Sequence, residues 1–191
     1  MKRRDAIKKI TIFTGGVIFL SAGIMPSCTK SASRDQLSEE DIVLLDQIGE
    51  TIIPETDKCG GAKAAKIGIY MRLMVDECLT KEDRRIFLEG LTLMENSAME
   101  QFKDNFLKLN PAQKKKLFLN LQTQAETYNK NKGNNLASNS IHYFDLFKKL
   151  TVDGYFTSEI GATKARRYQA VPGKYKGCIS YKKGDKAWAT S

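Results

Sequence analysis

Apolar residues recur every three or four positions along most of the chain after residue 38, and no run alternates apolar with polar residues. Residues at this spacing lie on one side of an α-helix, whereas alternation would be typical of a half-buried strand. The clearest case is the stretch 67–78, whose apolar face consists of Ile67, Tyr70, Met71, Met74, Val75 and Cys78. The pattern therefore predicts an all-α protein.

Helix start and stop signals divide this pattern into about five segments. Ser38 and Thr80 each precede acidic residues, and Asn110 precedes a proline, as is typical of a helix start. The expected helices lie between Ser38 and Pro54, from Ile67 to Cys78, from Thr80 to Phe102, from Asn110 to Tyr128, and from Ser140 to about Gly154. We expect a compact bundle of about five helices with an irregular basic C-terminal tail.

The residues that could carry chemistry have simpler structural interpretations. Four methionines fall at helical spacing among Leu and Phe, which favours core packing over haem or metal binding: Met71, Met74, Met94 and Met99. His142 is the single histidine and begins a helix, so we interpret it as structural. No glycine-rich nucleotide motif and no Cys-x-x-Cys-His haem motif occurs. We therefore assign no catalytic residue, no cofactor and no metal to this chain.

The first 27 residues resemble an export signal. A basic start that includes Arg3 and Arg4 precedes the uncharged stretch 10–25, which is too short and too rich in glycine and serine to span a bilayer. The paired arginines favour the twin-arginine route, with an ordinary Sec signal as the alternative. Either route predicts a periplasmic location.

Cys28 follows a small residue at the end of the apolar stretch, as in a bacterial lipoprotein. Lipidation there would anchor the mature chain to a membrane, because each buried methylene contributes roughly 0.8 kcal/mol. The alternative is a soluble periplasmic protein. In the mature chain we expect residues 28–37 to form a polar tether and residues 38–191 to form a single helical domain.

The net charge of +9 is unevenly distributed. Residues 1–27 contain five Lys or Arg and one Asp, so the mature chain would carry +5. The segment 161–191 contains eight basic residues and one acid, which leaves −2 for residues 28–160. A basic tail on a nearly neutral body does not indicate a nucleic-acid interface, and we expect no nucleic-acid binding.

Three cysteines remain after Cys28, so at most one disulfide can form within the chain. We favour Cys78–Cys178, which would fix the tail to the second helix and contribute up to roughly 4–5 kcal/mol in the chain-entropy model. A Cys59–Cys78 bond and three free thiols are the alternatives.

Three segments resemble the family of small subunits (subunit 3, or gamma) of membrane-bound gluconate 2-dehydrogenases. They are Glu50–Asp57 with Gly61–Ala65, Val75–Cys78, and Leu150–Lys164 leading into Val171–Cys178. The resemblance covers about residues 38–188 and is most specific in the sequence GYFTSEIGATKA. It departs from the family pattern at Cys59, where a non-cysteine turn residue is expected.

The resemblance implies a non-catalytic accessory subunit of an FAD-dependent sugar or polyol dehydrogenase, similar to gluconate 2-dehydrogenase or a glycoside dehydrogenase. The FAD would sit on a large partner of the glucose-methanol-choline type, and a third subunit could carry haem c as a cytochrome c. The small subunit would export, stabilise and anchor the flavoprotein. The alternatives are an oxidoreductase active on its own and a lipoprotein that binds a partner unrelated to a dehydrogenase.

The tail is the predicted docking surface, because Tyr, Trp and Arg dominate interface energetics and a +7 segment suits an acidic partner. The alternative is that the first two of these residues complete the core and the rest form a solvated strap. The candidate residues are Tyr155, Phe156, Arg166, Arg167, Tyr168, Tyr175, Tyr181 and Trp188.

Overall fold

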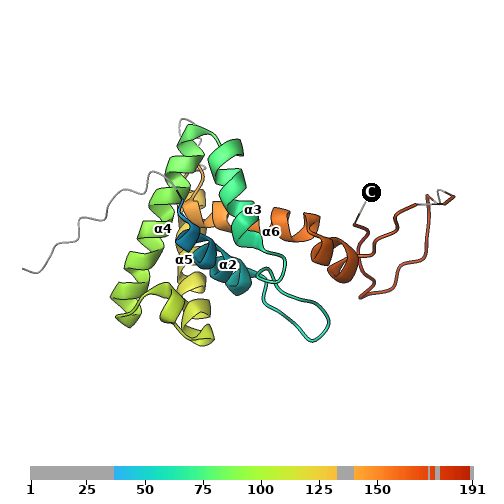
Figure 1. Cartoon of the computed structure of the whole chain (residues 1–191), viewed down its shortest axis with the longest axis horizontal. Helices are drawn as coiled ribbons and strands as arrows, with labels where there is room; N and C mark the ends of the chain where they lie inside the picture. Colours follow the sequence, from blue (N-terminus) through green and yellow to red (C-terminus); the bar gives the residue numbers. More distant parts are fainter. Residues whose placement is uncertain (1–36, 133–139, 172, 175–176, 190–191) are drawn as a thin grey trace, which may run out of the picture. The chain divides into compact units, whose positions relative to one another are not determined.

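The computed structural model describes residues 37–132, 140–171, 173–174 and 177–189, and all of them belong to one compact unit that spans 33–191. Five α-helices make up most of this part of the chain (Figure 1). They are α2 (Glu39–Ile52), α3 (Ile67–Leu73), α4 (Lys81–Phe102), α5 (Pro111–Lys132) and α6 (Tyr143–Thr157). The described residues contain no strand, so the predicted all-α fold is confirmed.

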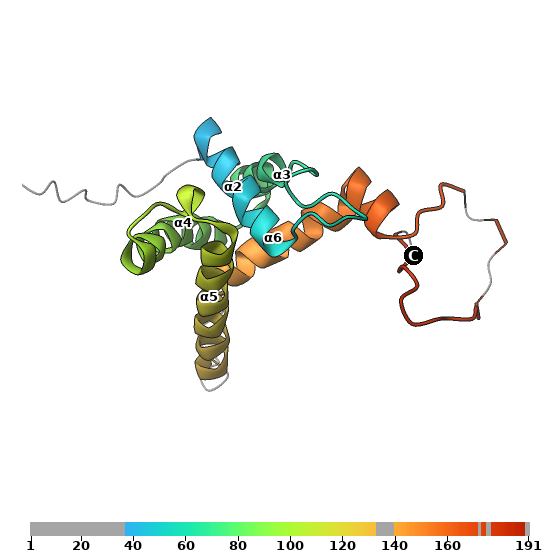
Figure 2. The same cartoon turned by 90° about the horizontal axis from the view of Figure 1, so that it is seen from below.

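Helix α6 is the centre of the packing, because it contacts each of the other four helices. Figure 2 shows it passing α5, α2 and α3 along its length. Its aromatic residues join the helices: Phe147 packs edge-on against Phe87 of α4 with ring centroids 4.9 Å apart, and Phe144 packs edge-on against Phe118 of α5 at 5.3 Å. The bundle therefore has one continuous apolar core.

The predicted helix starts at Ser38 and Thr80 are confirmed by their capping bonds. The Ser38 hydroxyl accepts a hydrogen bond from the Asp41 amide, and the Asp41 carboxylate accepts one from the Ser38 amide. The Thr80 hydroxyl accepts from the Asp83 amide in the same way, at 3.1 Å. Each bond satisfies an amide that has no partner within its helix. The acidic residues at these starts are thus structural.

Both predicted ends of α6 and two predicted burial assignments differ from the structure. Helix α6 begins after His142 rather than at Ser140, and it continues past Gly154 to Thr157. Leu37, assigned to the polar tether, is 5% exposed and belongs to the core. Met99, expected in the core, is 46% exposed. The other three methionines of that set are buried or packed against the core.

Three short segments complete the described helices. The predicted helix 67–78 ends as a π-helical turn, η1 (Met74–Cys78), and a second π-helical turn, η3 (Gly161–Ala165), follows α6. A 3₁₀ turn, η2 (Phe106–Lys108), joins α4 to α5. None of the helices in the described part of the chain combines the length and the apolar character needed to cross a membrane. The predicted signal 1–27 and Cys28 lie outside the described residues.

Candidate partner-binding surface

The loop between α2 and α3 is held by one carboxylate that the sequence analysis did not single out. Glu50 accepts hydrogen bonds from the amides of Glu55 at 2.7 Å and Lys63 at 2.9 Å. Gly61 lies against this carboxylate, where a Cβ atom would come within 2.4 Å of Glu50 Oε2. Glu50 therefore fixes this loop, and the glycine at position 61 leaves room for its carboxylate.

Tyr155 of α6, which is distant in the sequence, also fixes this loop. Its hydroxyl donates to the carbonyl of Gly60 at 2.7 Å and lies 3.1 Å from Cys59 Sγ. Burial, followed by the contact with Cys59, raises the pKa of Tyr155 to about 12. The side chain is only 3% exposed, so Tyr155 is a core residue and does not contribute to a docking surface.

After η3 the chain has no further described helix, and residues 187–189 return to pair with Arg167. The Arg167 amide donates to the Ala187 carbonyl at 2.8 Å, and the Ala189 amide donates to the Arg167 carbonyl at 2.9 Å. The Arg167 guanidinium also lies over the Trp188 ring, 4.8 Å from its centroid. We call Arg167 and Trp188 the closing pair, and the described residues between them (168–171, 173–174 and 177–187) the tail loop.

Two further contacts connect the closing pair to the helical body. The Arg166 guanidinium lies over the Phe156 ring of α6, 4.4 Å from its centroid. The Lys186 ammonium donates to the carbonyl of Lys164 in η3. The Phe156 ring in turn contacts Tyr155 edge-on at 5.2 Å. The base of the tail loop is therefore attached to the end of α6.

The described side chains of the tail loop are exposed. Its apolar members are 80% exposed at Val171, 56% at Ile179 and 74% at Tyr181. The loop turns at Lys182–Asp185, where Gly184 has a φ of 98° and the Asp185 carboxylate accepts from the Lys182 amide at 2.9 Å. A positive φ at the third position of a turn favours glycine. The one acid of the tail is thus used within the turn.

The structure separates the eight predicted docking residues into distinct groups. Tyr155 is buried, and Phe156 and Arg166 are half-buried against each other. Arg167 and Trp188 contact each other, while Tyr168 and Tyr181 are exposed. Tyr175 lies outside the described residues. No local sequence signal marks the closing pair, because its two members are 21 positions apart in the chain.

The predicted Cys78–Cys178 disulfide is not formed in the structure. Cys59, Cys78 and Cys178 are all free thiols, and the latter two are exposed. The reason lies in the path of the tail, which pairs with its own start at Arg167 rather than with the second helix. The closing pair supplies the tether that we had expected from a disulfide.

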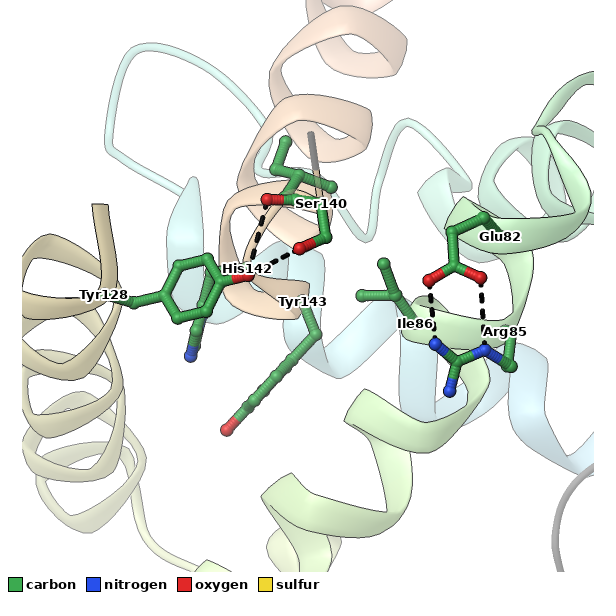
Figure 3. A pocket seen from close by; sticks show the side chains of 8 residues that line it. Glu82, Arg85, Ile86, Tyr128, Ser140, His142 and Tyr143 are labelled. Carbon is green, nitrogen blue, oxygen red and sulfur yellow. Dashed lines mark hydrogen bonds and ion pairs between the residues drawn. The ribbon is translucent and has the colours of Figure 1, made fainter. Parts of the chain in front are cut away.

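A pocket of about 260 Å³ contains the single histidine of the chain (Figure 3). His142 Nδ1 accepts a hydrogen bond from the Phe144 amide, and its ring lies between Tyr128 and Tyr143. Figure 3 shows the Tyr128 hydroxyl directed at Ser140, whose Oγ is 2.6 Å away. On the other side of the pocket Glu82 and Arg85 form an ion pair.

The polar groups of this pocket are thus used to hold the start of α6 and the start of α4. His142 has the structural role that we expected, since its acceptor nitrogen caps a helix. No cluster of three metal-ligating side chains was found among the residues that the structure describes.

The fold and this surface define an all-α domain that carries a basic loop closed onto its last helix. The chain belongs to the family of gluconate 2-dehydrogenase subunit 3, which its residues 39–173 match. That range includes every α-helix described above and ends inside the tail loop. No match was found among curated proteins, and none among solved structures.

Proposed function

We propose that this chain is the non-catalytic small subunit of an FAD-dependent sugar or polyol dehydrogenase complex. The observation that carries the proposal is the family match over 39–173, which indicates a subunit of a dehydrogenase complex. The FAD belongs on a large partner of the glucose-methanol-choline type, and haem c on a third subunit of the cytochrome c type. The work of this chain is to bind and stabilise the flavoprotein.

The geometry of the described residues supports a binding role. His142 caps the start of α6, Glu82 pairs with Arg85 within α4, and Tyr155 fixes a loop. The tail loop is an exposed and basic segment that is attached to the body at a defined place. An exposed basic segment with aromatic residues suits an acidic protein partner.

Export and anchoring belong to the same proposal and rest on the N-terminal sequence. Arg3 and Arg4 would direct the chain to the twin-arginine route, which carries folded cargo, and the bound flavoprotein would cross the membrane with it. A lipid on Cys28 would then retain the complex at the membrane on the periplasmic side.

Co-expression of the full chain with its flavoprotein tests the proposal. The two proteins should co-purify from the membrane fraction as a complex that contains flavin and oxidises a sugar or polyol. Arg3→Lys with Arg4→Lys should retain both proteins in the cytoplasm. The matched control Lys8→Arg with Lys9→Arg keeps the basic start and should leave export unchanged.

Three results would contradict parts of this proposal. Turnover or a flavin spectrum from the isolated chain would show that it is an enzyme itself. Failure of the flavoprotein to bind the chain would remove the accessory role. Export of the flavoprotein in the presence of the double Arg→Lys variant would leave the complex intact but remove the carrier role.

A further inference from the structure

We propose that the tail loop is a preorganised docking element for an acidic surface of the flavoprotein, with the closing pair as its positioning residues. The lysines and apolar side chains of the loop make the contact, while Arg167 and Trp188 hold its shape. The inference rests on the proposed function and adds to it the location of the interface and the chemistry of the partner surface.

The first step in the argument is that the two ends of the loop are fixed against each other. Two backbone hydrogen bonds of 2.8 and 2.9 Å join Arg167 to the chain around Trp188. The guanidinium of Arg167 covers the indole ring. A loop whose ends are joined has lost part of its conformational freedom before it meets a partner, which reduces the entropic cost of binding.

The second step is that the base of the loop is oriented by the helical body. Arg166 contacts Phe156, and Lys186 donates to the carbonyl of Lys164. Since Phe156 belongs to α6, the helix that contacts all the others, the base of the loop has a defined direction relative to the core. A segment that did not pack on the helical body would lack these two contacts.

The third step concerns what the loop presents. Lys174, Lys182 and Lys183 are exposed, and none of them forms an ion pair with another described residue. Tyr181 and Ile179 are also exposed beside this charge. Asp185 is occupied in the turn by the Lys182 amide. The loop therefore offers uncompensated positive charge around apolar side chains, which fits a partner surface with carboxylates around an apolar depression.

An anionic lipid surface could also attract these lysines, but it does not explain the closing pair. Lysine-rich segments bind such membranes through charge alone, without a defined conformation. A structured base attached to α6 is useful when the contact must match the shape of a protein. We therefore assign the loop to the flavoprotein and make the membrane an outcome of the test.

The contact itself is tested with a charge-reversal pair. Lys182→Glu with Lys183→Glu should weaken binding of the mature chain to the purified flavoprotein at least tenfold, chiefly through slower association, and should flatten its salt dependence. Lys116→Glu with Lys130→Glu reverses the same charge on exposed positions of α5. This control should bind within about threefold of the wild type.

The closing pair is tested with a readout that a contact residue would not change. Trp188 is the single tryptophan of the chain, so its emission reports this site in the unbound protein. Arg167→Ala should shift the emission towards that of a fully exposed indole while the helix content stays constant. It should also weaken flavoprotein binding, and Trp188→Phe, which keeps an aromatic ring, should bind better than Trp188→Ala.

The outcomes separate this inference from the proposed function. If the wild-type chain fails to bind the flavoprotein, the proposed function fails first. If the complex forms and the loop variants bind as tightly as the wild type, only the docking assignment is overturned. It is also overturned if those variants lose binding to phosphatidylglycerol vesicles but keep full affinity for the flavoprotein, because the loop then serves the membrane.

Discussion

His142 shows at the residue scale how one side chain can combine a structural role with sensitivity to pH. Its Nδ1 atom accepts the hydrogen bond that starts α6, and only the neutral ring can accept there. Burial lowers the pKa of His142, and the negative charge of Asp145 opposes this effect in part. Because the unfolded chain takes up the proton more readily than the folded one, protonation favours unfolding.

The free energy of unfolding should therefore fall as the pH decreases below about 6.5, where an unperturbed histidine titrates. His142→Asn keeps an acceptor at the helix start and removes the titration. Its melting temperature should change less between about pH 7.5 and 5.5 than that of the wild type. Equal pH dependence of the two proteins in thermal denaturation would show that His142 does not control it.

The candidate site could be predicted from the sequence only in part, as two aromatic residues show. Tyr155 and Trp188 looked alike as aromatic residues near a basic tail, but one is buried and the other closes a loop. The difference depends on Gly60 and Arg167, which are distant in the chain and carry no periodic signal. Residue types at the site could be predicted, whereas their partners could not.

At the scale of elements, helix boundaries with a local signal could be predicted, whereas the two ends of α6 could not. Each capping side chain accepts a hydrogen bond from the amide three residues later, so the signal is local in the sequence. This holds for Ser38, Thr80 and Asn110. Gly154 resembled a stop signal, but it lies inside α6 because Tyr70 of α3 packs directly against it. A glycine that permits close packing of two helices cannot be distinguished by sequence alone from one that ends a helix.

Gly154→Ala should therefore destabilise the bundle despite the higher helix propensity of alanine. The added Cβ would lie 2.4 Å from Tyr70 Cδ1, so α3 and α6 would have to separate. We expect a net loss of about 1–2 kcal/mol in the free energy of unfolding, as overpacking outweighs the gain in propensity. Chemical denaturation measures this loss.

The matched control for that measurement is Gly173→Ala. Apart from Gly173 itself and its two chain neighbours, no atom lies within 4 Å of the position that its Cβ would take. The control should change the free energy of unfolding by no more than about 0.5 kcal/mol, as for most surface substitutions. If Gly154→Ala were as stable as the control, the Tyr70 ring or α3 could move away from the added Cβ at little cost in free energy.

The whole molecule consists of a helical body whose core is complete without the tail loop. Every residue of the apolar core lies between Leu37 and Tyr155. The tail adds a cation–π contact and two backbone hydrogen bonds at the closing pair. Such contacts at exposed positions contribute roughly 1–2 kcal/mol together.

A chain that ends at Gly173 should consequently remain helical and unfold cooperatively. Its free energy of unfolding should be lower than that of the full mature chain by no more than about 2 kcal/mol. Circular dichroism with thermal denaturation measures both properties. A truncated chain that lost its cooperative transition would show that the tail is part of the folding unit.

The central position of α6 has a consequence for synthesis on the ribosome. The helix that contacts the other four is also the last α-helix in the described part of the chain, and Tyr155 contacts Cys59, which lies 96 residues earlier. Assembly from such distant segments is slow, because chain entropy is lost before the distant contacts form. The packing around α6 therefore cannot be completed until translation of the chain is nearly finished.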